Sequence, residues 1–355
     1  MSSIEINIAG KTISRDVTPY VIAELSANHN GSLDAALRLI EIAKIAGASA
    51  VKIQTYRPDT ITLNSDREDF YINDGKWAGQ TLFDLYGSAH TPWDWHPALF
   101  EHASNIGITI FSSPFDSTAV DLLEGLNAPA YKIASFEAVD LNLIRYVAST
   151  GKPLIISTGM ADADEIQEAI AAAHDGGCDQ LAILHCVSGY PAPAADYNLR
   201  TIPDMMQRFG LVTGISDHTL DNTTAIAAVA LGACIIEKHF TLDRSGGGPD
   251  DSFSLEPDEL RALCSSANTA WRALGQVDYG RKSSELGNVK FRRSLYFTKP
   301  LKAGQTIPAD AVRSVRPGFG LAPKYMNQVV GATLTADVDF AEAVTWDHIS
   351  QSSDH

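Results

Sequence analysis

The sequence is poor in cysteine and has no long hydrophobic run. Its four cysteines have no CxxC spacing, which argues against a disulfide framework or a zinc knot and favours buried, reduced thiols. No apolar run approaches the roughly 18 residues that cross a bilayer, and the N-terminal stretch MSSIEINIAGKTIS has no basic region followed by an apolar core. We therefore expect a cytoplasmic protein with no membrane partner.

Basic residues are also in short supply. The chain has 27 lysines and arginines against 43 aspartates and glutamates, which gives a net charge of −16 over 355 residues. A field of this sign repels nucleic acid at long range, so we expect no nucleic-acid partner. A small anionic substrate is still compatible, because a few lysines focused in a cleft outweigh the distant surface charge.

Eight short apolar runs between Tyr20 and Leu274 alternate with longer amphipathic segments, which is the pattern of repeated βα units. The runs are VIAEL (21–25), AVKIQT (50–55), ITIFSS (108–113), AYKIAS (130–135), LIIST (154–158), LAILHC (181–186), LVTGIS (211–216) and CIIEKHF (234–240). Eight units over roughly 250 residues match a (β/α)8 TIM barrel in count and length. The predicted fold class is therefore α/β.

Two further segments depart from this pattern. An irregular stretch over residues 57–95, rich in Asp, Gly and aromatics, predicts a long functional loop over the barrel mouth. From residue 275 to 288 the composition turns polar and glycine-bearing, and short strands follow. We predict a barrel domain over residues 1–280, a linker over 281–289 and a small domain over 290–355.

Ionisable side chains within apolar strands are costly to bury unless they are paired or liganded, and several strands here carry them. In a TIM barrel the carboxyl ends of the strands form the active site, so these residues predict one shared polar site. For any single residue, an outward side chain or a structural ion pair is the alternative. The candidates are Glu24, Asn28, His29, Lys52, Gln54, Lys132, Ser135, Ser157, His185, Ser188, Ser216, Asp217, His218, Glu237, Lys238 and His239.

Their chemistry favours an anionic substrate and a metal ion. Lys52 and Lys132, with serines nearby, suit a compound with phosphate and carboxylate groups, although strand-end serines also serve as turn formers. His218 and His239 end adjacent strands and can converge on one divalent ion. Structural hydrogen bonds are the alternative for both histidines, and no third protein ligand is evident. Asp250, in a glycine-rich loop, is placed to bind sugar hydroxyls.

Taken in order, eleven motifs resemble the sialic acid synthase family over nearly the whole chain. They are IAELSANHNG, VKIQTY, FSSPFD, YKIAS, ISTGM, LHCVSGYP, GISDHT, IEKHF, GPDDSFSLEP, RRSLY and VRPGFGL. Within the family, LFDLYGSAHTPWDWHPALF and SVRPGFGLAPKY are most similar to the pseudaminate branch rather than the neuraminate or legionaminate branches.

The resemblance implies an enzyme that joins phosphoenolpyruvate to a free amino sugar with C–O cleavage. It also implies a C-terminal antifreeze-like (SAF) domain and a homodimer in which each small domain covers the partner's active site. The sugar is 2,4-diacetamido-2,4,6-trideoxy-L-altrose in the pseudaminate branch and N-acetylmannosamine in the neuraminate branch. A trideoxy sugar favours an apolar surface, which Trp77, Phe83 and Tyr86 of the 57–95 stretch can provide.

The resemblance also implies a role for each candidate residue. Glu24 or Glu237 handles a proton, and Ser188 stands where some relatives carry Asn. The residues implied to hold phosphoenolpyruvate are Lys52, Lys132, Ser135, Ser157, Ser188 and Ser216. His218 and His239 are implied to hold the metal, which is Mn2+ with Mg2+ or Co2+ as alternatives. The residues implied to contact the sugar are Glu24, Gln54, Tyr190, Asp250 and, from the partner subunit, Arg316.

Two readings of another class stay open at this point. One is a non-catalytic sugar-binding or antifreeze-like protein that keeps the barrel as a scaffold, because a fold does not fix a function. The other is a barrel aldolase in which Lys132 forms a Schiff base with a carbonyl substrate.

Overall fold

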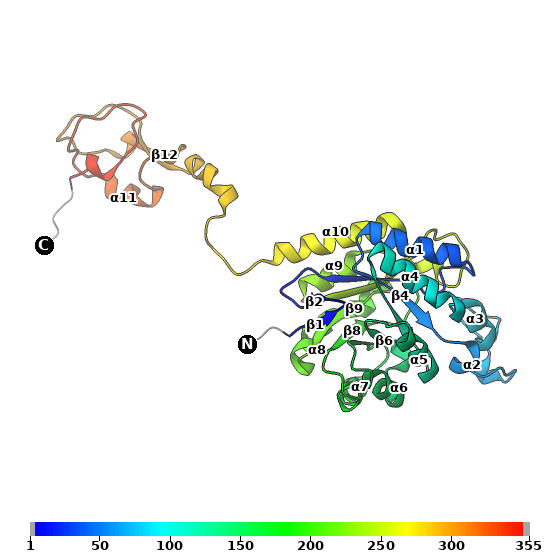
Figure 1. Ribbon diagram of the computed structural model, residues 1–355. Coiled ribbons are helices and arrows are strands. Elements are labelled where there is room, and N and C mark those ends of the chain that lie inside the picture. The colour runs from blue at the N-terminus through cyan, green and yellow to red at the C-terminus, as the bar shows by residue number, and fades with distance from the viewer. Residues whose placement is uncertain (1–3, 351–355) are drawn as a thin grey trace. The chain divides into compact units, whose positions relative to one another are not determined.

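The computed structural model describes residues 4–350 (Figure 1). By its internal contacts the chain divides into two compact units, with the division between Gly275 and Gln276. Each unit has its own hydrophobic core.

The first unit is built on a closed barrel of parallel strands, with a helix in each connection from one strand to the next, as in a TIM barrel. Strand β10 pairs with β3 and so closes the ring, with His239 beside Glu24 in register. The TIM-barrel prediction is confirmed. The eight strands are β3 (Tyr20–Glu24), β4 (Ala50–Thr55), β5 (Thr109–Pro114), β6 (Tyr131–Ile133), β7 (Leu154–Ser157), β8 (Leu181–Cys186), β9 (Val212–Ser216) and β10 (Ile235–His239).

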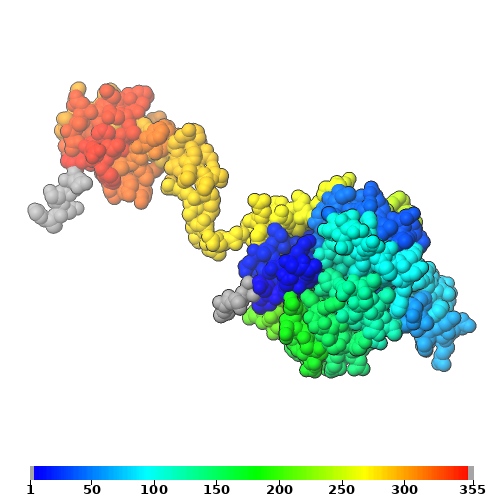
Figure 2. Space-filling model, viewed as in Figure 1, coloured from blue at the N-terminus to red at the C-terminus, as the bar shows by residue number. Residues whose placement is uncertain are grey.

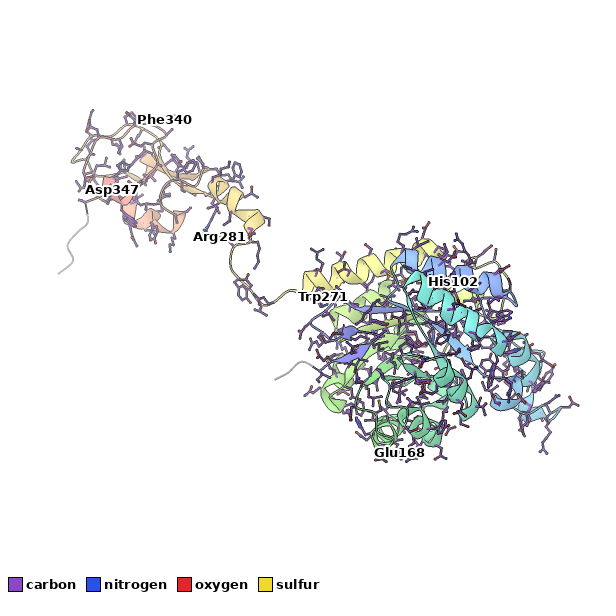
Figure 3. All side chains as sticks on the ribbon, in the orientation of Figure 1. His102, Glu168, Trp271, Arg281, Phe340 and Asp347 are labelled. Atoms are coloured by element: carbon purple, nitrogen blue, oxygen red, sulfur yellow. The ribbon has the colours of Figure 1, made fainter. Side chains whose placement is uncertain are left out.

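Helices surround the barrel (Figure 1). Helix α1 shows the local rules: the Ser32 side chain accepts from the Ala35 amide at its start, and Gly47 ends it with a left-handed φ of 98°. Charged side chains such as Glu168 on α7 point to the outside (Figure 3). The surrounding helices are α1 (Leu33–Ala46), α4 (His96–Ile106), α5 (Ser117–Gly125), α6 (Leu141–Ala148), α7 (Ala163–Asp175), α8 (Thr201–Phe209), α9 (Thr223–Ala230) and α10 (Pro257–Leu274).

Apolar residues close the amino end of the barrel. The hairpin of β1 (Ile6–Ile8) and β2 (Lys11–Ile13) packs its isoleucines against Phe111 and Leu184 of the barrel interior. The indole of Trp271, on α10, donates to the carbonyl of Arg15 at 2.9 Å (Figure 3). Because this end of the interior is filled with apolar side chains, the buried polar groups described below lie at the carboxyl end.

The connection between β4 and β5 is the irregular stretch that the sequence indicated. It contains α2 (Pro58–Ile61), η1 (Glu68–Phe70), α3 (Leu82–Ala89) and η2 (Trp93–Trp95), and a bridge between Tyr71 and Thr81 closes its outer loop. Part of it, in light blue, stands out from the surface of the first unit (Figure 2). Among residues 4–350, no helix combines the length and the apolar character that a bilayer crossing requires.

The second unit is small and irregular. Strand β11 (Ser294–Phe297) pairs antiparallel with β12 (Val312–Val315), and Leu295, Phe297 and Val344 lie in its core. Gly320 has no room for a side chain, because a Cβ there would lie 2.4 Å from the Leu295 carbonyl oxygen. The remaining elements are η6 (Ser283–Phe291), η7 (Ala309–Ala311), η8 (Pro323–Tyr325), α11 (Met326–Val329) and η9 (Trp346–His348).

Candidate active site

Two lysines and two glutamates from separate strands meet inside the carboxyl end of the barrel. Lys52 on β4 is ion-paired with Glu24 on β3, and its Nζ lies 3.9 Å from Oε2 of Glu237 on β10. Lys132 on β6 lies 3.5 Å from Oε1 of Glu237. All four residues are buried, at most 5% exposed. The residues that the sequence grouped by strand position therefore form one compact cluster of balanced charge.

Burial and charge act against each other in this cluster. Burial alone raises the pKa of a carboxyl, and for Glu24 it outweighs the Lys52 ammonium, so the pKa of Glu24 lies above its usual value. For Glu237 the ammonium groups of Lys132 and Lys52 outweigh burial, and the pKa falls below its usual value. Burial lowers the pKa of Lys132. An incoming anion would therefore meet ammonium groups held in a water-poor site, where their attraction is strong.

Serine hydroxyls gather beside the lysines. Ser135 Oγ accepts from the Gly159 amide at 3.2 Å, and Ser216 Oγ donates to Glu237 Oε1 at 3.1 Å. A Cβ at Gly159 would lie 2.3 Å from Ser188 Oγ and 2.7 Å from Ser135 Oγ, so only glycine leaves room for these hydroxyls. Ser157 Oγ is buried and has no hydrogen-bond partner within the described chain. This arrangement is suited to an anion that brings its own oxygen acceptors.

The two histidines also come together. The ring centroids of His218 and His239 are 5.4 Å apart. His218 Nδ1 lies 2.8 Å from the Val187 carbonyl, and a proton donated there leaves the lone pair of Nε2 free for a ligand. His239 Nδ1 is buried without a hydrogen-bond partner in the described structure and lies 4.0 Å from Asp250 Oδ2.

These residues fit a divalent ion as two protein ligands. Burial, together with neighbouring positive charge, holds the pKa of His239 well below its usual value. For His218 the contact with the Cys186 sulfur outweighs burial and raises the pKa, so a metal ion, which binds a neutral imidazole, would have to displace a proton there. Among residues 4–350, no group of three or more His, Cys, Asp or Glu side chains is arranged to hold a metal ion. Water or substrate would have to complete the shell.

The residues predicted for the sugar surround the histidines only in part. The centroid of the Tyr190 ring lies 4.4 Å from that of the His218 ring and 6.1 Å from that of the His239 ring. Asp250 follows β10 near His239, and its carboxylate accepts from Ser26 Oγ. Gln54 is half-buried on β4. Arg316 belongs to the second unit, directly after β12, and is exposed there.

Several of the polar candidates on the strands or just beyond them have structural partners instead. His185 Nε2 is bonded to the Tyr197 carbonyl, and the Asn28 amide donates to the Phe240 carbonyl at 2.8 Å. Lys238 Nζ bonds Asp217 Oδ2 at 2.9 Å and the carbonyls of Thr219 and Asp221 at 2.7 and 2.8 Å. The structural alternative therefore applies to His185, Asn28, Asp217 and Lys238.

Lys238 offers a test of that structural role. Replacing Lys238 with methionine leaves the Asp217 carboxylate buried and unpaired, and we expect the free energy of unfolding to fall by about 3–5 kcal/mol. Urea unfolding of the full chain measures the change. The control is Arg208→Met, whose pair with Asp204 is more than half exposed on both sides and is expected to change stability by less than about 1 kcal/mol. Equal losses in the two variants would contradict the prediction.

Glu137 is an acidic residue whose titration responds to the Lys132 charge, and the sequence did not single it out. It ends η3 (Ser135–Glu137), the turn directly after β6, and its Oε2 is buried with no hydrogen-bond partner in the described structure. Burial raises its pKa to about 7, although the Lys132 charge opposes this. The only signal in the sequence is an acidic residue five positions after Lys132, just beyond the predicted strand.

Comparisons with known proteins identify the family of the chain. A family model described as the NeuB family matches residues 39–279. The pseudaminic acid synthase of Campylobacter jejuni (strain 81-176) is 44% identical over 93% of this chain and 96% of that protein. The chain belongs to the NeuB family. It is thus an enzyme of the phosphoenolpyruvate-dependent nonulosonic acid synthases, and the resemblance to sialic acid synthases is confirmed.

Other matches agree with this NeuB-family assignment. A SAF domain model matches residues 292–350, so the second unit is a SAF domain, as the resemblance implied. The N,N'-diacetyllegionaminic acid synthase of Legionella pneumophila is 35% identical over 94% of this chain and 95% of that protein. The solved N-acetylneuraminic acid synthetase of Leptospira borgpetersenii has a TM-score of 0.72 at 30% identity, covering 81% of this chain and 95% of that one.

Proposed function

We propose that this NeuB-family enzyme is a pseudaminic acid synthase, which condenses phosphoenolpyruvate, 2,4-diacetamido-2,4,6-trideoxy-L-altrose and water to pseudaminate and phosphate. The observation that carries the proposal is the difference in identity. The chain is 44% identical to a pseudaminic acid synthase and 35% identical to a legionaminic acid synthase over nearly equal shares of its length. N-acetylneuraminate or legionaminate synthesis is the alternative.

In this proposal Lys52 and Lys132 bind the phosphate and carboxylate of phosphoenolpyruvate, with help from Ser135, Ser157, Ser188 and Ser216. The unpartnered hydroxyl of Ser157 supports this role. So do the two buried ammonium groups, which can bind an anion by exchanging their contacts with Glu24 and Glu237.

His218 and His239 would hold the divalent ion, Mn2+ with Mg2+ or Co2+ as alternatives. When bound there, such an ion polarises the aldehyde oxygen of the open-chain sugar. The Val187 carbonyl orients the His218 ring, and the Tyr190 ring beside His218 keeps water from that side. Glu24, Gln54, Tyr190, Asp250 and a partner's Arg316 would contact the sugar.

The chemistry joins C3 of phosphoenolpyruvate to C1 of the sugar. The aldehyde oxygen at C1 takes a proton and becomes a hydroxyl, and positive charge develops at C2, where water adds and loses a proton. The C2 carbonyl then forms as the C2–O bond breaks, and phosphate leaves with its bridging oxygen and the remaining proton of the C2 hydroxyl. Glu24 or Glu237 would handle a proton in this reaction, and both are ion-paired with lysines. Glu137 has no such partner, and a pKa of about 7 suits a group that takes a proton from the attacking water.

A substrate panel tests the proposal. Phosphate release is measured with phosphoenolpyruvate and each of the two sugars, the diacetamido-trideoxy sugar and N-acetylmannosamine, with and without added Mn2+. We expect the larger kcat/KM with the diacetamido-trideoxy sugar and a loss of activity with a chelator that Mn2+ restores. A preference for N-acetylmannosamine would overturn the pseudaminate assignment.

The Glu137→Gln variant tests the proton-handling role. We expect kcat to fall by about 100- to 10,000-fold, and the limb of the pH–rate profile near pH 7 to disappear. Stability gives a second measurement with a defined sign. The folded wild type holds the Glu137 proton up to about pH 7 while the unfolded chain releases it near 4.5, so wild-type stability falls with rising pH between these values. The variant lacks this slope, and an unchanged slope would contradict the burial of Glu137.

A further inference from the structure

One indole of the 57–95 connection reaches loops on two other strands. Trp77 Nε1 donates to the carbonyl of Pro249, in the loop after β10, at 3.2 Å. The Trp77 ring lies 6.0 Å from the ring of Tyr190, which follows β8. In the order of the ring, β8 is four strands from β4, where the connection begins. The connection therefore extends over the carboxyl end of the barrel.

Trp77 completes a group of aromatic side chains beside the two histidines. The Tyr190 ring lies 5.3 Å from the Phe253 ring, and Phe253 lies 5.1 Å from the His239 ring. The three rings of Trp77, Tyr190 and Phe253 form a wall, which we call the aromatic wall. It stands next to Asp250, the residue directly after the Pro249 carbonyl that Trp77 binds.

We propose that Trp77 determines sugar specificity: its indole, within the aromatic wall, packs against the deoxygenated and acetamido-bearing edge of the substrate. The inference rests on the proposed function, because it assumes that the sugar lies beside His218 and His239. A methyl group gains contact against aromatic carbon. A hydroxyl packed against the face of the Trp77 indole loses its hydrogen bond to water and finds no acceptor or donor on that face.

The rest of the connection does not share this position. Tyr86 packs on Tyr56 with ring centroids 5.7 Å apart, and Tyr56 packs on Phe115 with ring centroids 5.1 Å apart. Trp93 also bonds a backbone carbonyl, that of Tyr56 at 3.1 Å, but its ring is covered by the Arg57 guanidinium at 4.6 Å. Trp93 is therefore a matched control, with the same side chain and the same kind of hydrogen bond away from the aromatic wall.

Two variants separate the effect of the Trp77 ring from that of its hydrogen bond to the Pro249 carbonyl. Trp77→Phe keeps an aromatic face and removes the N–H that binds Pro249, whereas Trp77→Gln keeps an N–H donor and removes the aromatic face. We expect Trp77→Gln to lower the ratio of kcat/KM for the diacetamido-trideoxy sugar to that for N-acetylmannosamine by roughly 10- to 100-fold. Trp77→Phe and Trp93→Phe should leave this ratio within a few-fold of wild type, and KM for phosphoenolpyruvate should be unchanged in all three.

The kinetic results test the role of the Trp77 ring, its hydrogen bond and the substrate assignment separately. If Trp77→Gln lowers kcat/KM equally for both sugars, or leaves the ratio unchanged, Trp77 has only a structural role and the inference is wrong. If Trp77→Phe lowers the ratio as much as Trp77→Gln, the hydrogen bond to Pro249 carries the effect and the wall does not. A wild-type preference for N-acetylmannosamine contradicts the pseudaminate assignment instead, whatever the variants do to the ratio.

Discussion

Replacing Lys132 with methionine will lower kcat/KM for phosphoenolpyruvate by roughly 100- to 1,000-fold. Lys132 is 2% exposed and lies 3.5 Å from Glu237 Oε1. Without its ammonium, Glu237 keeps one of its two lysine neighbours, Lys52 at 3.9 Å, and the excess negative charge repels the anion that the site is proposed to bind. Steady-state kinetics with phosphoenolpyruvate as the varied substrate measure the loss.

Controls separate this loss from unfolding. The variant leaves Glu237 short of a partner, so its stability will fall as well. The double variant K132M/E237Q removes both charges of the pair. We expect it to have a larger free energy of unfolding than K132M and to be equally inactive. Lys152→Met, which removes a lysine paired with Glu124 at 2.6 Å outside the cluster, should keep wild-type kinetics. Full activity in the double variant would show that Lys132 does not bind the substrate.

The fold could be predicted from the sequence because each strand is marked twice, by its own apolar run and by the amphipathic segment after it. Assigning individual side chains to the site was harder. On β10, Glu237 and His239 face the cluster and Lys238, between them, binds Asp217 behind it. Side chains alternate between the two faces of a strand, so Lys238 has to point away from Glu237 and His239. The sequence alone does not show whether Lys238 or the other two residues point into the barrel.

The remaining site residues depend on contacts that no local pattern encodes. Glu137 lies in a short turn beyond its strand, where neither the two-residue nor the 3.6-residue period applies. The contact of Trp77 with Pro249 joins residues 172 positions apart. The sequence could indicate that the 57–95 stretch lies near the mouth. It could not separate Trp77 from Phe83 and Tyr86, because only the folded connection determines which ring reaches Tyr190.

The proposed exchange of SAF domains between subunits predicts that two inactive chains restore each other. Arg316→Ala removes the residue proposed to reach the partner's sugar, and Lys132→Met disables the barrel of the other chain. When the two are co-expressed with different tags and the hybrid is purified, one barrel is intact and receives an intact Arg316 from its partner. The hybrid should therefore have about half the wild-type activity, one site of two. If Arg316 serves its own barrel, both sites carry a defect and the hybrid stays inactive.

Arg313→Ala, a change at an exposed arginine on β12, is the matched control and should be fully active alone.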